Sequence, residues 1–156
     1  MLEAMKNAGF IQYEISNFCK DNMFSRHNSN YWKKEHYLGL GPSAHSFDGS
    51  SRQWNKANNA LYIKGIETGK PGFEKEELTT EQRYNEYVLT TLRTMWGADL
   101  NYIISEFGDE FHQYILKASS KYSGEMIESQ KNKLFLTDKG KLFADRIASD
   151  LFKIKE

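Results

Sequence analysis

The second half of the chain carries the clearest alternation of apolar and polar positions. Residues 79–82 (Thr-Thr-Glu-Gln) fit a capping box, and apolar residues at helical spacing follow as far as Met95. Two more helices are predicted over 99–107 and 109–121, divided at Gly108. Three successive amphipathic helices indicate a part of the chain that buries its own apolar faces.

A β-hairpin and a closing helix are predicted after these helices. Short apolar runs at 126–128 and 134–136 flank a polar segment, which is typical of two strands joined by a turn. The closing helix is predicted to start at Thr137 or Asp138. Its apolar face would hold Leu142, Phe143, Ile147, Leu151 and Phe152. Three helices, a two-stranded wing and a closing helix predict a winged-helix-like, mostly helical domain.

The first half begins with a weaker pattern. A short helix is predicted over 2–8, ended by Gly9, and a strand over 12–18. A helix, a glycine and a strand in this order are the αβ half of a βα unit. We therefore expect that the first residues of the sequence lie in the middle of such a unit. Residues 19–30 have no clear period and are predicted to be a loop.

The next segment is apolar and punctuated by glycine. Residues 37–47 predict a strand that enters a tight turn at Gly41-Pro42, and residues 55–68 predict a helix. Composition changes at Pro71-Gly72, which we take as the boundary between a domain over 1–72 and a domain over 73–156. The fold class predicted is α+β or an α/β fragment.

Composition and charge narrow the function classes. Hydrophobic residues make up 39% of the 156 residues and charged residues 27%, which suffices for a buried core. Basic and acidic residues number 21 each, and residues 73–156 carry 12 basic against 15 acidic side chains. This balance argues against nucleic-acid binding, also by the winged-helix-like half. No apolar run is long enough to predict an integral membrane segment.

The densest cluster of candidate chemistry is the segment 25–32 (Ser-Arg-His-Asn-Ser-Asn-Tyr-Trp). If this segment were helical, His27 and Tyr31 would share a face, with Trp32 beside them. An imidazole next to large aromatic rings is able to ligate a heme iron. From residue types alone, the simpler interpretation is favoured: a loop filled by aromatic side chains, in which His27 only makes hydrogen bonds.

The other candidates are weaker. His27, His36 and His45 are spaced nine residues apart, unlike the closely paired ligands of structural zinc sites. The turn from Gly39 to Ser46 lacks the spacing of a dinucleotide-binding fingerprint. Cys19 is the one cysteine, which excludes a disulfide framework and a self-contained iron–sulfur cluster.

Three segments together closely resemble a known family. They are Tyr13–Phe18, Ser25–Trp32 and Tyr37–Ser46, with Arg52 and Asn55 also fitting the pattern. The chain is similar to the oxygen-independent coproporphyrinogen III oxidase-like radical SAM proteins. Within this family, the chain more closely resembles the HemW-type heme chaperones. The motif His-Asn-x-x-Tyr-Trp distinguishes that branch. The resemblance implies that residues 1–72 are the C-terminal end of a partial (βα)₆ radical SAM barrel and 73–156 the family's C-terminal domain.

The resemblance also implies site residues. His27 would be the heme-iron ligand, Asn28 would orient it, and Tyr31 and Trp32 would face the porphyrin. The turn from Gly41 to His45 resembles the family segment that closes the cofactor pocket. The family's Cys-x₃-Cys-x₂-Cys motif is absent. S-adenosyl-L-methionine and a [4Fe-4S] cluster are therefore expected only in a longer protein, and no catalytic residue is assigned to this chain.

Two functions follow as expectations. The first is that the chain is the C-terminal fragment of a cytoplasmic radical SAM protein that binds and delivers heme in porphyrin metabolism. Its partners would be heme or a porphyrin, a heme-acceptor protein and the N-terminal portion of the barrel. The family is enzymatic, whereas this fragment alone would have no radical chemistry. The alternative is a non-enzymatic protein-interaction module formed by the acidic, winged-helix-like half.

Overall fold

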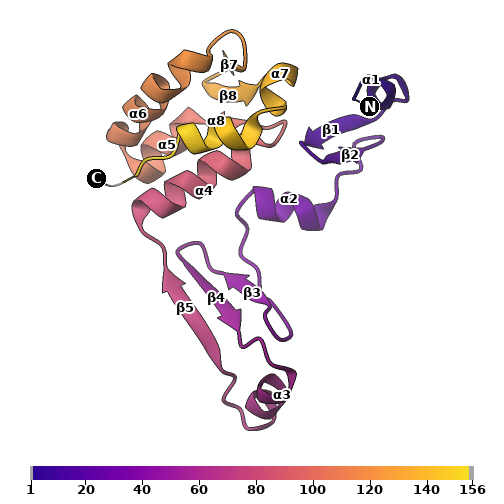
Figure 1. Cartoon of the computed structure of the whole chain (residues 1–156), viewed down its shortest axis with the longest axis vertical. Helices are drawn as coiled ribbons and strands as arrows, with labels where there is room; N and C mark the ends of the chain where they lie inside the picture. Colours follow the sequence, from indigo (N-terminus) through magenta and orange to yellow (C-terminus); the bar gives the residue numbers. More distant parts are fainter. Residues whose placement is uncertain (1, 155–156) are drawn as a thin grey trace. The chain divides into compact units, whose positions relative to one another are not determined.

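The computed structural model describes residues 2–154 and divides the chain into two compact units (Figure 1). One unit combines residues 1–33 with 80–156, and the other is formed by residues 34–79. The division differs from the boundary predicted at Pro71-Gly72, which lies inside the second unit. The reason is strand pairing: β5 (Phe73–Glu77) pairs along its whole length with β4 (Ser51–Asn55).

The larger part of the first unit is a group of helices with a small antiparallel sheet. The helices are α4 (Thr80–Leu92), α5 (Leu100–Phe107), α6 (Asp109–Ser119), the 3₁₀ turn η1 (Ser120–Tyr122), α7 (Asp138–Lys141) and α8 (Ala144–Asp150). The strands are β6 (Ala98–Asp99), β7 (Ile127–Gln130) and β8 (Lys133–Leu136), in the order β6-β8-β7. The predicted helices over 99–107 and 109–121 and the predicted hairpin are confirmed. Strand β6 had not been predicted.

The core of this part follows from the apolar spacing of its helices. The fully buried side chains include Tyr84 and Leu92 of α4, Ile103 of α5, Ile115 of α6 and Ile147 of α8. Each helix thus turns one apolar stripe inward, as an amphipathic sequence does. The segment's own residues therefore form a contiguous core.

The closing helix is two helices, not the single helix predicted. Helix α7 ends at Lys141 and α8 begins at Ala144, so Leu142 and Phe143 fall on the connecting turn. Their exposed fractions are 72% and 48%, and the prediction that they share one apolar helix face with Ile147 is wrong. The backbone of Phe143 leaves the helical region (φ −121°, ψ 21°), which interrupts the apolar stripe before Ile147 resumes it.

The N-terminal part of the first unit is helix α1 (Leu2–Asn7) followed by a hairpin of β1 (Ile11–Glu14) and β2 (Asn17–Cys19). The helix was predicted, whereas the single strand over 12–18 is wrong. Ile15 and Ser16 form a turn in the middle of the alternating pattern. The backbone N–H of Ile15 donates to the carbonyl of Arg93 at 3.0 Å, which joins the hairpin to the end of α4.

The second unit is a three-stranded antiparallel sheet with one helix. The sheet order is β3 (His45–Phe47), β4 and β5, and the helix is α3 (Asn59–Glu67). Only residues 45–47 of the strand predicted over 37–47 belong to the sheet. The helix predicted over 55–68 is confirmed from residue 59, where the side chain of Asn58 caps its first turn.

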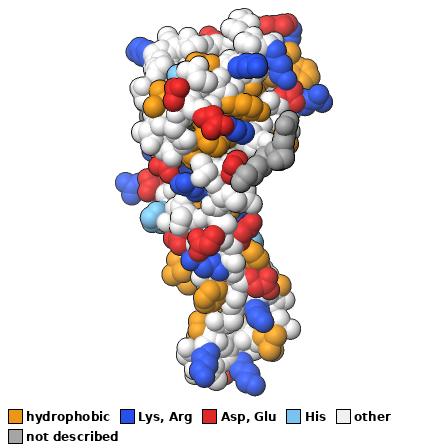
Figure 2. Space-filling view, turned by 90° about the vertical axis from the view of Figure 1, so that its left-hand side faces the viewer, with side chains coloured by type: hydrophobic (Ala, Val, Ile, Leu, Met, Phe, Trp, Pro, Cys, Tyr) orange, Lys and Arg blue, Asp and Glu red, His pale blue; other side chains and the backbone are white. Residues whose placement is uncertain are grey.

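The surface was searched for features of membrane and polyanion binding. Across residues 2–154, every helix is too short or too polar to cross a bilayer. Acidic and basic side chains are interspersed over the face drawn in Figure 2. That face therefore presents no extended region of one charge.

Candidate functional site

The histidine-bearing segment forms helix α2 (Arg26–Trp32), although residues 19–30 were predicted to be a loop. Its sequence contains two asparagines and a serine, which have low helix propensity because their side chains compete for backbone hydrogen bonds. The hydroxyl of Ser25 accepts a hydrogen bond from the backbone N–H of Asn28 at 3.3 Å and caps the first turn. Tertiary packing and this cap, rather than propensity, therefore stabilise the helix.

Helix α2 brings His27 and Tyr31 together. Their ring centroids lie 4.9 Å apart with an interplanar angle of 87°, the edge-to-face arrangement that aromatic rings prefer. Both side chains are exposed, Tyr31 by 42%. Among the described residues, none donates or accepts a hydrogen bond at the imidazole of His27, so its ring nitrogens are accessible to a ligand.

Asn28 is held by a polar chain that leads into the unit's interior. Its Nδ2 donates to Oδ1 of Asn17 at 3.0 Å, and Nδ2 of Asn17 donates to the carboxylate of Glu14. Glu14 is only 2% exposed, and its Oε1 accepts from Nε of Arg93 at 3.1 Å and from Nη2 at 3.0 Å. A buried carboxylate needs such pairing. The sequence offered no local signal for this network.

Trp32 lies on a different part of the helix surface from the His27–Tyr31 pair. Adjacent residues project about 100° apart around an α-helix, so Trp32 does not share the face of Tyr31. The indole is partly buried, and its Nε1–H is buried without a hydrogen-bond partner among residues 2–154. The structure therefore groups His27 with Tyr31 and places Trp32 beside them.

The glycine turn belongs to the second unit and is built around Asn55. The side-chain Nδ2 of Asn55 donates to the carbonyl of Gly41 at 2.9 Å, and its backbone N–H donates to the carbonyl of Ala44 at 3.0 Å. Gly41 has φ +106°, a conformation that favours glycine. His45 is exposed, and its ring lies 6.0 Å from that of Trp54. The turn is thus rigidly tied to β4.

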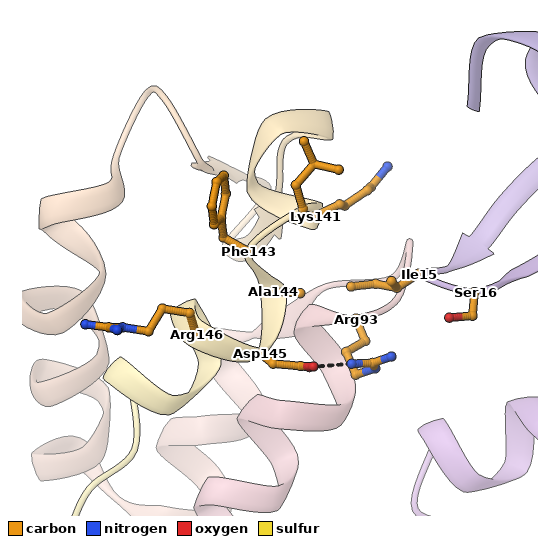
Figure 3. Close-up of a pocket in the computed structure, with 9 residues that line it drawn as sticks. Ile15, Ser16, Arg93, Lys141, Phe143, Ala144, Asp145 and Arg146 are labelled. Atoms are coloured by element: carbon orange, nitrogen blue, oxygen red, sulfur yellow. Dashed lines mark hydrogen bonds and ion pairs between the residues drawn. The ribbon is translucent and has the colours of Figure 1, made fainter. Parts of the chain in front are cut away.

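A pocket of about 410 Å³ lies in the first unit, where the β1–β2 turn faces the connection between α7 and α8 (Figure 3). Its lining includes Arg93, Lys141 and Arg146. Each of these cations is already paired: Arg93 with Asp145 (dashed in Figure 3) and Glu14, Lys141 with Asp138, and Arg146 with Asp150. The pocket therefore has little unbalanced charge with which to recognise a ligand.

The described residues do not form a cluster of metal ligands. Within residues 2–154, no three His, Cys, Asp or Glu side chains gather closely enough to hold a metal ion. The thiol of Cys19 is free and buried. A heme iron differs from such a site because one protein side chain is enough to ligate it.

Comparison with known proteins identifies relatives. No family model matches the sequence. The chain is 32% identical over 151 residues to the heme chaperone HemW of Bacillus subtilis, an alignment that covers 94% of this chain and 39% of that protein. The chain is thus similar in sequence to HemW proteins. It therefore spans about 39% of the length of this HemW relative.

Two further comparisons point to related proteins. A 41-residue segment, 26% of this chain and 9% of the relative, is 49% identical to the mitochondrial radical S-adenosyl methionine domain-containing protein 1 of Danio rerio. The structure of coproporphyrinogen III oxidase (HemN) from Escherichia coli, a radical SAM enzyme, superposes with a TM-score of 0.71 at 16% identity. The superposition covers 97% of this chain and 39% of the HemN chain, and it lies in the C-terminal part of HemN. This match shows that the chain shares an α+β fold with part of HemN.

Proposed function

We propose that this chain is the heme-binding, C-terminal portion of a HemW-type radical SAM protein. His27 ligates the heme iron, Tyr31 packs against the porphyrin, and Asn28 holds the orientation of α2. The observation that carries the proposal is the exposed His27–Tyr31 pair, in a chain similar over 94% of its length to a heme chaperone. Trp32 contributes at the edge of this surface.

The residues present fit a heme but not an iron–sulfur cluster. His27 offers an exposed imidazole that has no hydrogen-bond partner among the described residues, and an adjacent aromatic ring. A [4Fe-4S] cluster needs three or four thiolates, whereas the sequence holds one cysteine. We therefore place S-adenosyl-L-methionine and the cluster in the remainder of a longer, cytoplasmic protein. The barrel of that protein would end in the N-terminal part of this chain, although residues 34–79 form one unit across the boundary predicted at Pro71-Gly72. Gly41 and His45 lie on the turn assigned to its cofactor pocket.

The second part of the proposal concerns heme delivery. Helices α4, α5 and α6 with the β6-β8-β7 sheet have the element order of a winged-helix-like domain, here closed by α7 and α8. Residues 73–156 carry more acidic than basic side chains. This charge favours binding to a protein over binding to a nucleic acid, whose phosphates are negative. This domain would present the heme-loaded chain to an acceptor protein.

Hemin titration of the 156-residue chain tests the assignment. His27→Ala should weaken binding by about tenfold or more, equivalent to about 1.4 kcal/mol, because the iron loses its axial ligand. His36→Ala and His45→Ala are matched controls that remove exposed imidazoles from the other unit. Trp32→Ala should have an intermediate effect. Equal affinities for His27→Ala and the unaltered chain would refute the role of His27.

A second candidate function is a protein-interaction module, and one observation favours it. Leu142 and Phe143 are exposed by 72% and 48% on the turn between α7 and α8, beside the pocket of Figure 3. Adjacent exposed apolar side chains are typical of contact surfaces. Leu142→Ser with Phe143→Ser should abolish cross-linking to an acceptor while hemin affinity is retained. Unchanged cross-linking would exclude this surface.

A further inference from the structure

A second pocket of the first unit, of about 470 Å³, lies beside α2. It is lined by Met23 and Phe24 from the segment before α2, by Arg26, Ser29 and Lys33 from α2 and its end, and by Trp96 after α4. Two asparagines complete the lining. The volume is within the range of pockets that hold small molecules, roughly 300–1,000 Å³.

The charge of this pocket is unbalanced. Arg26 and Lys33 are its ionisable residues, and no carboxylate lines it. Among residues 2–154, neither cation forms an ion pair, in contrast to the three paired cations of the pocket in Figure 3. Two unpaired cations at one pocket favour an anionic ligand, and a guanidinium matches the geometry of a carboxylate.

A buried hydroxyl provides a second, independent indication. Ser29 is only 6% exposed, and its Oγ is buried without a hydrogen-bond partner among the described residues. Leaving a buried polar group unpaired is unfavourable, so most such groups in native proteins have a partner. A ligand oxygen entering the pocket would accept the Ser29 hydroxyl hydrogen.

The remaining walls are apolar and aromatic. The rings of Phe24 and Trp96 have centroids 5.8 Å apart, and Met23 is 71% exposed. Lys33 Nζ lies 5.5 Å from the centre of the Trp96 ring, so its position is already constrained. Such walls would contact the apolar part of a ligand next to a carboxylate that reaches Arg26 and Ser29.

We propose that this pocket binds the propionate carboxylates of a tetrapyrrole, an inference that rests on the proposed heme-binding function. Arg26 directly precedes His27, so the two side chains project about 100° apart around α2, whereas Ser29 and Lys33 project farther from His27. Arg26 is thus the cation of the pocket that a carboxylate of a ligand bound to His27 would reach first. Arg26, Ser29 and Lys33 select a porphyrin with free carboxylates over one without them.

The test compares three probes on the 156-residue chain: hemin, hemin dimethyl ester and iron-free protoporphyrin IX. Arg26→Gln combined with Lys33→Gln should weaken hemin binding by about tenfold and dimethyl ester binding by less than about twofold. Both side chains are exposed, so the fold should be unaffected. Lys117→Gln combined with Lys131→Gln removes two exposed positive charges elsewhere and should change neither affinity.

The outcomes distinguish a failure of the proposed propionate site from a failure of the proposed iron ligand, His27. Equal effects of the double variant on hemin and its ester, or no effect on either, would overturn the propionate site even if His27→Ala still weakens hemin. If His27→Ala has no effect while hemin and protoporphyrin IX both depend on Arg26 and Lys33, the pocket stands and the iron assignment is wrong. Failure of all three probes to bind would overturn both.

Discussion

The buried ion pair between Glu14 and Arg93 yields the sharpest quantitative prediction. Arg93→Met keeps the length of the side chain but removes the charge that faces a 2% exposed carboxylate. Glu14 would still accept hydrogen bonds from the backbone N–H of Ser16, at 2.8 Å, and from Asn17, but would lack any cation. Removing one partner of a buried pair costs about 3–5 kcal/mol. We expect that loss in the free energy of unfolding.

Urea unfolding with a matched control measures this effect. Asp145 binds the same arginine, but its side chain is 78% exposed, so Asp145→Ala should cost less than about 1 kcal/mol. Glu14→Gln combined with Arg93→Met should recover much of the loss, because no buried charge then remains unpaired. A cost for Arg93→Met no greater than that for Asp145→Ala would refute the view that this pair secures the hairpin.

Three further predictions follow from other contacts. Gly39→Ala should destabilise residues 34–79 by about 1–3 kcal/mol, seen as faster hydrogen exchange there, because its Cβ would lie 2.2 Å from the carbonyl oxygen of His45. Hydrogen bonds from Lys6 and Lys141 lower the pKa of Asp138 to about 2, so its contribution is present above its ordinary pKa of 3.8 and is lost as pH falls through about 2. Asp138→Asn should therefore lower Tm at neutral pH and flatten its decline between these two pH values. Anaerobic reconstitution without heme should yield no stoichiometric iron–sulfur cluster, because a single thiolate cannot hold such a cluster. The iron content of the protein measures this.

The helices of the second half could be predicted because their signals are local. Asp99 caps α5 through backbone N–H groups two and three residues away, and Gly108, with φ +89°, separates α5 from α6. Ile103 and Ile115 are completely buried, one on each of these two helices. The helix cap, the apolar face and the terminating glycine all lie within about a dozen residues and indicate the same helix. The tertiary structure therefore agrees with the local preference.

The errors arose where tertiary contacts override a local pattern. The alternation over residues 12–18 continues through the turn at Ile15 and Ser16, and the backbone hydrogen bond from Ile15 to Arg93 joins residues far apart in the sequence. The pairing of β4 with β5 leaves Pro71-Gly72 inside a unit, although composition changes there. Neither contact has a signature in neighbouring residues, because strand partners are chosen by packing across the sheet.

The candidate site depends on both local sequence signals and distant tertiary contacts. His27 and Tyr31 are four residues apart, so their contact follows as soon as the segment is known to be helical. The helix itself depends on distant partners, since Asn28 is held by Asn17, which is held by Glu14, which is paired with Arg93. The residue types indicate the chemistry, but the geometry that serves it is set by a residue near the end of α4. The proposed heme site on α2 should therefore respond to changes at Arg93, even though that side chain is outside the motif from Ser25 to Trp32.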